Sequence, residues 1–113
     1  MPPALPLLKG TLDLLVLKTL SWGAQHGYGI ATFLEQQSAG TLEVEDSALY
    51  QALHRLENRG LIEAEWGVTE NNRRARYYRL TSAGRARLRK ETETWLRYTQ
   101  SVGAILQMSA RSR

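Results

Sequence analysis

The residues best suited to chemistry in this chain lie on one face of a helix predicted between Asp46 and Gly60. Leu49, Leu53 and Leu56 recur at steps of four and three residues, so they share one stripe that faces a core. The opposite face carries no carboxylate, only side chains able to donate to phosphates or reach base edges: Gln51, His54, Arg55, Asn58 and Arg59. This face predicts a contact with nucleic acid, and a merely solvated face is the alternative.

The segment after this helix supports the nucleic-acid interpretation. Leu61 to Trp66 alternates, with Trp66 on the apolar face, and predicts a half-buried strand; residues 75–80 predict a second strand. Between them lies a polar loop with the turn-prone pair Asn71-Asn72 and then two arginines. Helix, strand, basic loop and strand form the order of a winged helix, whose helix enters the major groove while the loop touches the backbone or minor groove.

The charge distribution points to the same region. The net charge is +4, yet residues 51–90 alone hold ten Lys or Arg against four Asp or Glu. Residues 1–50 hold two against five. Positive charge is therefore concentrated in the predicted helix, its loop and the residues that follow, as phosphate binding requires.

Other functions find little support in the composition. The chain has two histidines, His26 and His54, two aspartates, Asp13 and Asp46, and no cysteine, without the close pairing that a metal site or an acid–base pair needs. We therefore expect no enzyme activity, no metal and no cofactor. Since no stretch approaches the roughly 18 apolar residues of a membrane span, we expect a cytoplasmic protein without membrane contact.

Two further helices are predicted to support the helix at 46–60, which we call the recognition helix. Residues 8–21 are apolar on nearly every side, so one flank, with Leu14 and Leu17, is expected to face a second subunit. In the next helix Tyr28, Ile30 and Leu34 are expected to face the core. Asp46 or Ser47 is expected to cap the recognition helix, and Gly60 to end it.

The last predicted helix runs from Ser82 to about Gln107, with Thr81 as its cap. Leu88, Trp95 and Val102 are spaced by seven residues, and Leu106 extends the same seam. A helix of about 25 residues, roughly 38 Å long, is too long for so small a domain to cover. The sequence thus predicts a mainly α fold with a small β-wing: a winged helix-turn-helix domain at 1–81, with a loose N-terminal arm at 1–7, and a C-terminal dimerisation helix at 82–113.

The chain resembles the PadR family of bacterial transcription regulators, in particular its short, acidobacterial-type branch. The resembling segments are LLKGTLDLLVLKTL, HGYGI, LYQALHRLENRGLIEAEWG, ENNRRARYYRLTSAGR and the region of Trp95. The resemblance implies a homodimer formed through the C-terminal helix and the first helix, bound to a palindromic promoter site, usually as a repressor. It also implies an alternative role for Trp95, at a small-molecule effector site between subunits.

The chain departs from the family pattern at the start of the recognition helix. Ser47-Ala48 stands where the family commonly has glycine followed by a hydroxyl residue, and Gln51 stands where proline is frequent. Ser47 is expected to replace the missing phosphate contact.

The leading hypothesis is a homodimeric, sequence-specific repressor that binds double-stranded operator DNA. The residues expected to contact DNA are Ser47, Tyr50, Gln51, His54, Arg55, Arg73, Arg74 and Arg76; those expected at the dimer interface are Leu14, Leu17, Leu88, Trp95, Val102 and Leu106. One alternative is a winged-helix module for protein–protein interaction without specific DNA recognition. Another is sequence-independent packaging of nucleic acid.

Overall fold

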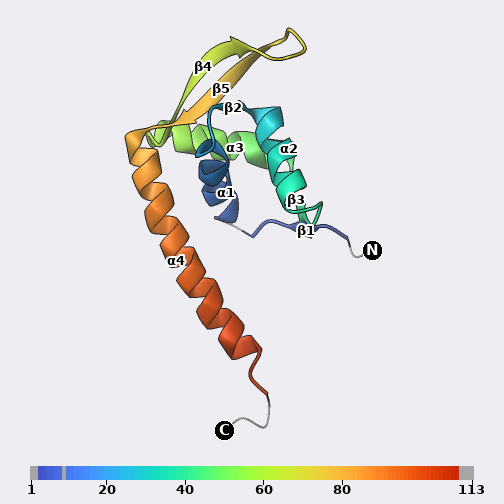
Figure 1. Cartoon of the computed structure of the whole chain (residues 1–113), viewed down its shortest axis with the longest axis vertical. Coiled ribbons are helices and arrows are strands. Elements are labelled where there is room, and N and C mark those ends of the chain that lie inside the picture. The colour runs from blue at the N-terminus through green and yellow to red at the C-terminus, as the bar shows by residue number, and fades with distance from the viewer. Residues whose placement is uncertain (1–2, 9, 110–113) are drawn as a thin grey trace.

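The computed structural model describes residues 3–8 and 10–109, which form four helices and five strands. In chain order the elements are β1 (Leu5–Pro6), α1 (Thr11–Leu20), β2 (Gln25–His26), α2 (Gly27–Gln37), β3 (Leu42–Glu43), α3 (Asp46–Asn58), β4 (Ile62–Val68), β5 (Arg74–Leu80) and α4 (Ser82–Leu106). The β4–β5 hairpin lies at one end of the molecule, and α4 runs toward the other end (Figure 1). The predicted class, mainly α with a small β-wing, is confirmed.

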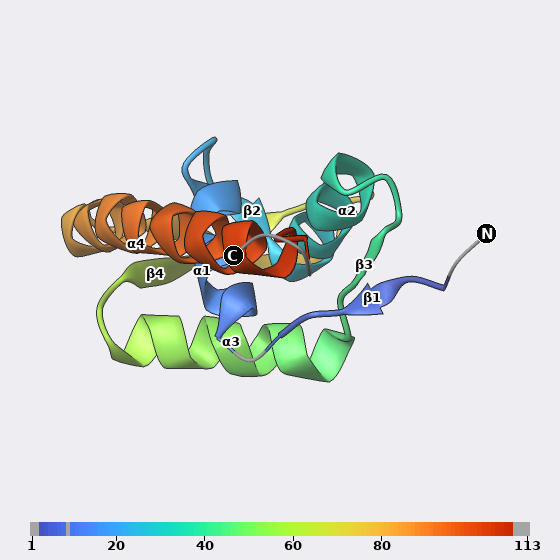
Figure 2. The same cartoon turned by 90° about the horizontal axis from the view of Figure 1, so that it is seen from below.

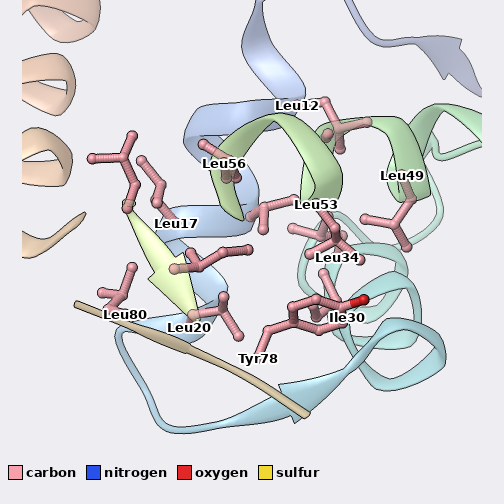
Figure 3. Close-up of a cluster of buried hydrophobic side chains, with 14 residues drawn as sticks. Leu12, Leu17, Leu20, Ile30, Leu34, Leu49, Leu53, Leu56, Tyr78 and Leu80 are labelled. Atoms are coloured by element: carbon pink, nitrogen blue, oxygen red, sulfur yellow. The ribbon is translucent and has the colours of Figure 1, made fainter. Parts of the chain in front are cut away.

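The core lies where α1, α2 and α3 pack against the base of the hairpin (Figure 3). Leu49, Leu53 and Leu56 are each 1% exposed, which confirms the stripe predicted from their spacing. Leu17 is also 1% exposed, so it has no surface left for a second subunit, and its predicted place at the dimer interface is wrong. A helix that is apolar on nearly all sides does not reveal from sequence which flank turns inward. In α1 it is the flank of Leu17, whereas Leu14 stays half-buried.

The hairpin is antiparallel, with a register that runs from Ile62 opposite Leu80 to Val68 opposite Arg74. β2 pairs with the other edge of β5, which gives the strand order β2-β5-β4. Both predicted strands are confirmed, and β4 continues two residues beyond its predicted end. The prediction that one face of β4 is buried is correct only near the base of the hairpin. Ile62 is buried there, but Trp66 is 60% exposed because the hairpin extends past the helices.

α4 has the bounds that the sequence predicted, to within one residue. Thr81 caps it: the Oγ1 atom accepts a hydrogen bond from the Gly84 N–H at 3.0 Å and donates one to the Gly60 carbonyl at 2.7 Å. Gly60, with φ of 72°, adopts the left-handed conformation expected after α3. The helix packs on α1 and β5 near its start, then continues away from the body (Figure 1).

Three smaller expectations were wrong. Leu5–Pro6 of the predicted loose arm pairs in parallel with Leu42–Glu43, while residues 1–2 lie outside the described residues. The Tyr28 side chain is 77% exposed and does not join the core. Finally, Glu45 occupies the N-cap position of α3 and no side chain caps the helix, so neither Asp46 nor Ser47 has that role.

Candidate nucleic-acid interface

The outward stripe of α3 is the centre of the candidate interface. Figure 2 shows α3 along one edge of the molecule, with α1 between it and α4. Ser47, Gln51, His54 and Asn58 follow one another at helical spacing, and all four side chains are exposed. Since the buried leucines hold the opposite side of the helix in the core, this stripe is presented to solvent as a single polar surface. Its hydroxyl, amide and imidazole groups can hydrogen-bond to phosphates and base edges.

Arg55 lies on the flank of α3 that faces α1, rather than on the outward stripe. Its guanidinium forms a two-point contact with the Asp13 carboxylate, through Nη2–Oδ1 at 2.6 Å and Nε–Oδ2 at 3.3 Å. The hydrogen bonds that Arg55 donates to Asp13 raise the pKa of Arg55 above its ordinary value, although slight desolvation opposes the shift. Arg55 is therefore a fixed cation that connects α3 to α1, and the structure does not present it as a free side chain for bases.

The tip of the hairpin presents two further cations. A tight turn connects the strands: the Thr69 N–H donates to the Arg73 carbonyl at 2.8 Å, and the Asn72 N–H donates to the Thr69 carbonyl at 2.9 Å. Asn72 has φ of 61°, a left-handed conformation that asparagine tolerates better than most residues. The turn therefore places Arg73 and Arg74 in solvent at the end of the wing.

Arg76 links the wing to the recognition helix. Its Nη2 atom lies 2.8 Å from Glu57 Oε2 on α3, and its guanidinium also lies over the Tyr78 ring, 5.7 Å from the centroid. One of its five N–H donors is thus taken up by a carboxylate of the same chain. This ion pair shows that the face of the hairpin with Arg76 turns toward α3.

Tyr50 lies at the junction between α3 and the start of α2. A Cβ atom added at Gly27 would lie 2.8 Å from the Tyr50 hydroxyl oxygen and 3.0 Å from the ring, so the ring packs directly on the glycine. Tyr50 is nevertheless 54% exposed, and it lies one helical turn from Ser47 and from His54. The residue is therefore placed at the edge of the candidate interface.

The predicted dimer contacts lie on the opposite side of the molecule. Leu88 packs against the core, Leu14, Trp95 and Val102 are half-buried, and Leu106 is exposed. Between α1 and α4 there is an open cleft of about 510 Å³, whose lining includes Leu14, Trp95 and Tyr98. The outer part of α4 also exposes Leu96, Tyr98 and Ile105, so its apolar surface is wider than the predicted seam.

Sequence reasoning missed the carboxylate partners and the exposure of Trp66. The ion pairs join residues 42 and 19 positions apart, and no local pattern reports such distances. The exposure of Trp66 depends on how far the helices cover β4, and the alternation in the sequence indicates only which face the residue occupies. Within residues 3–8 and 10–109, no group of His, Asp or Glu side chains is arranged to hold a metal, and no helix is suited to cross a membrane.

Known proteins resemble this chain in both sequence and fold. The profile of the family described as "Transcriptional regulator PadR-like family" matches residues 16–90. A PadR family transcriptional regulator from Eggerthella lenta is 31% identical, with 89% of this chain and 86% of the other covered and a TM-score of 0.75. A transcriptional regulator from Clostridium thermocellum is 26% identical, with coverage of 88% and 96% and a TM-score of 0.80.

An uncharacterized protein of Lysinibacillus sphaericus is 25% identical over 101 residues, which cover 89% of this chain and 93% of that protein. The profile match covers more than half of the chain, and the solved structures share the fold over most of both chains. The chain therefore belongs to the PadR-like family of transcriptional regulators, proteins that bind DNA.

Proposed function

We propose that this protein represses transcription by binding a palindromic operator as a homodimer. The observation that carries the proposal is the uncovered polar stripe of α3 beside a wing that ends in Arg73 and Arg74. A helix fits the major groove, and a basic hairpin next to it reaches the flanking backbone.

Each side chain of the stripe has a proposed role. Gln51 and His54 lie at the middle of α3 and contact base edges, since an amide or an imidazole can distinguish them. Ser47 and Tyr50 contact phosphates with their hydroxyl groups. Arg73 and Arg74 contact the backbone or the minor groove. Arg55 and Arg76 position α3 and the wing, because carboxylates of this chain already hold them.

The homodimer is proposed from the outer part of α4. Its exposed apolar side chains, among them Leu96, Ile105 and Leu106, are covered by none of the residues that the structure describes. A twofold pair of such helices would set two α3 helices about 34 Å apart, one turn of the duplex. Trp95 belongs to this interface. The cleft beside it is within the size range of small-molecule sites, so it is also where an effector would bind.

Footprinting on the DNA upstream of the protein's own gene tests the proposal. We expect one protected site with two half-sites related by twofold symmetry, and loss of this protection in the double variant Gln51→Ala, His54→Ala. In a cell that carries the operator before a reporter, deletion of the protein should raise expression. A protein-interaction module would protect no site, and a packaging protein would bind all duplexes with one affinity.

A further inference from the structure

The wing carries two large apolar side chains that no described part of the chain covers. Trp66 and Val68 are each 60% exposed. They alternate with Glu65 and Gly67 and continue the face of β4 that begins with the buried Ile62. This apolar stripe therefore starts in the core and runs out along the hairpin into solvent. A single exposed apolar residue is ordinary, but an adjacent pair on a projecting hairpin suggests a contact surface.

The strand register shows which side of the wing this stripe occupies. Trp66 lies opposite Arg76, and Val68 lies opposite Arg74, so the four side chains share one face of the hairpin. Arg76 is bound to Glu57 of α3 at 2.8 Å. The face with the apolar stripe is therefore the face that turns toward the recognition helix, on the side where the proposed function places the duplex.

Arg74 and Trp66 form a unit. The Arg74 Cζ atom lies 4.6 Å from the centroid of the indole ring, within the range of a cation–π contact. A flat guanidinium stacked on a flat ring loses fewer conformations when it binds a phosphate or a groove than a free arginine does. Trp66 thus orders the arginine that the sequence suggested for the backbone or minor groove.

We propose that Trp66, Val68 and Arg74 form a minor-groove contact, an inference that rests on the proposed DNA-binding function. Arg74 enters the groove, while the indole and Val68 pack against the deoxyribose rings of its wall. The negative potential of the minor groove attracts arginine, and apolar side chains of groove-binding proteins commonly pack there. A face that joins cations to apolar carbon matches a sugar–phosphate surface better than a neutral protein surface.

Fluorine NMR of the full chain tests the contact directly. The protein has three tryptophans, which can all be replaced by 5-fluorotryptophan and assigned by single Trp→Phe variants. On addition of a mixed-sequence duplex of about 30 base pairs, which spans roughly three helical turns, we expect the Trp66 resonance to shift. The Trp22 resonance should stay in place. Trp22 is a matched internal control, because it is 73% exposed and the Lys18 Nζ atom lies 5.6 Å from its ring centroid. This pair lies at the end of α1 rather than on the wing.

Affinity measurements separate the apolar part from the charge. Trp66→Ala should weaken duplex binding by about fivefold, the scale of a cation–π contact, and leave the salt slope unchanged. Trp66→Phe should recover most of the loss, and Trp22→Ala should bind like the wild type. Arg74→Ala should lower the salt slope by about 1.

Synthetic duplexes locate the groove. Inosine–cytosine and guanine–cytosine pairs present the same major-groove edge, but inosine lacks the amino group of the minor groove. The wild type should prefer poly(dI-dC) over poly(dG-dC), and Arg74→Ala should reduce that preference.

The outcomes distinguish this inference from the function on which it rests. A wild-type protein that binds no duplex would overturn both. Duplex binding with an unmoved Trp66 resonance, and a Trp66→Ala variant of wild-type affinity, would overturn the minor-groove contact alone. The apolar stripe would then belong to a different partner.

Discussion

At the scale of single residues, two arginines predicted to contact DNA are held by carboxylates of the same chain. Asp13 takes two donors of Arg55, and Glu57 takes one of Arg76. A guanidinium has five N–H groups, so each arginine keeps donors for a phosphate while it fixes the position of α3 or of the wing. Both pairs are partly exposed, and each contributes only about 0.5–1 kcal/mol to stability.

Asp13→Asn should therefore change stability and DNA affinity in opposite directions. The free energy of unfolding should fall by about 0.5–1 kcal/mol, because the ion pair is lost. Affinity for a mixed-sequence duplex should rise by about threefold, because Arg55 of the recognition helix is released and a carboxylate is removed. Urea unfolding and fluorescence anisotropy measure the two effects.

Glu63→Gln is the control for Asp13→Asn. It makes the same change in net charge at an exposed ion pair with Arg79 on the hairpin. Its sequence position, odd-numbered in β4, places it on the face opposite Trp66. If both variants raise duplex affinity equally, net charge alone explains the effect, and the position of Asp13 has no special role.

Tyr78 gives the structure a predictable response to alkaline pH. Burial raises the pKa of its phenol above the ordinary 10.0, with a partial opposing effect from Arg76. Above pH 10 the unfolded chain loses this proton while the folded chain keeps it, so the contribution to stability is full below pH 10 and is lost as pH rises further. Tyr78→Phe should lose less stability than the wild type between pH 8 and about 10.5. Urea unfolding at the two pH values measures this. Tyr28→Phe, at an exposed ring, should behave like the wild type.

At the scale of elements, the start of α4 is the junction on which the position of the long helix depends. Gly84 is buried one turn into the helix, against the Leu61 carbonyl and the Leu80 side chain. The cap formed by Thr81 bonds to Gly60 in the same place. Helix α4, the end of α3 and the base of the hairpin therefore meet with no room for another side chain, which fixes the direction in which α4 leaves the body.

Gly84→Ala should disrupt this junction, whereas Gly103→Ala should not. The added methyl at position 84 would overlap the Leu61 carbonyl oxygen, and we expect a loss of at least about 2 kcal/mol from overpacking. At Gly103, on the same helix, an added Cβ meets nothing within 4 Å of the described chain. Alanine there should be neutral or stabilise by up to about 1 kcal/mol. Thermal unfolding at equal protein concentration compares them, and equal melting temperatures would contradict the close approach at Gly84.

The elements differ in how well the sequence predicts them. The bounds of α3 and α4 followed from local signals, namely apolar spacing, Gly60 and the Thr81 cap. These signals act within a few residues of the chain and do not depend on how the helices pack. Leu17 and Arg55 were misplaced because their surroundings depend on how α1 is rotated against α3, which no short pattern encodes. Trp66 was misplaced for a related reason: alternation identifies a face of a strand, but tertiary packing decides how far along the strand that face stays covered.

At the scale of the whole molecule, the two proposed functions, DNA contact and dimerisation, are separated along its length. The wing lies toward one end and the tip of α4 toward the other, and the molecule is 60 Å along its longest axis (Figure 1). α1 contacts both α3 and α4, so the recognition helix and the proposed dimer helix rest on the same central element. A dimer formed through α4 would therefore set the separation of two recognition helices through α1, without a flexible linker.

Val102→Glu tests that arrangement, because Val102 lies on the proposed seam of α4 beyond the part that packs on the body. Two glutamates brought together across a twofold interface would lose hydration and repel each other, so light scattering should report a monomer. Gln100→Glu makes the same change in charge at an exposed position on the same helix, and it should remain dimeric. Circular dichroism should show both variants folded, because neither side chain belongs to the core.

A monomer would also bind its operator about 100-fold or more weakly, since the second half-site contact would no longer be intramolecular. A Val102→Glu protein that stays dimeric would show that the subunits meet through another face of α4.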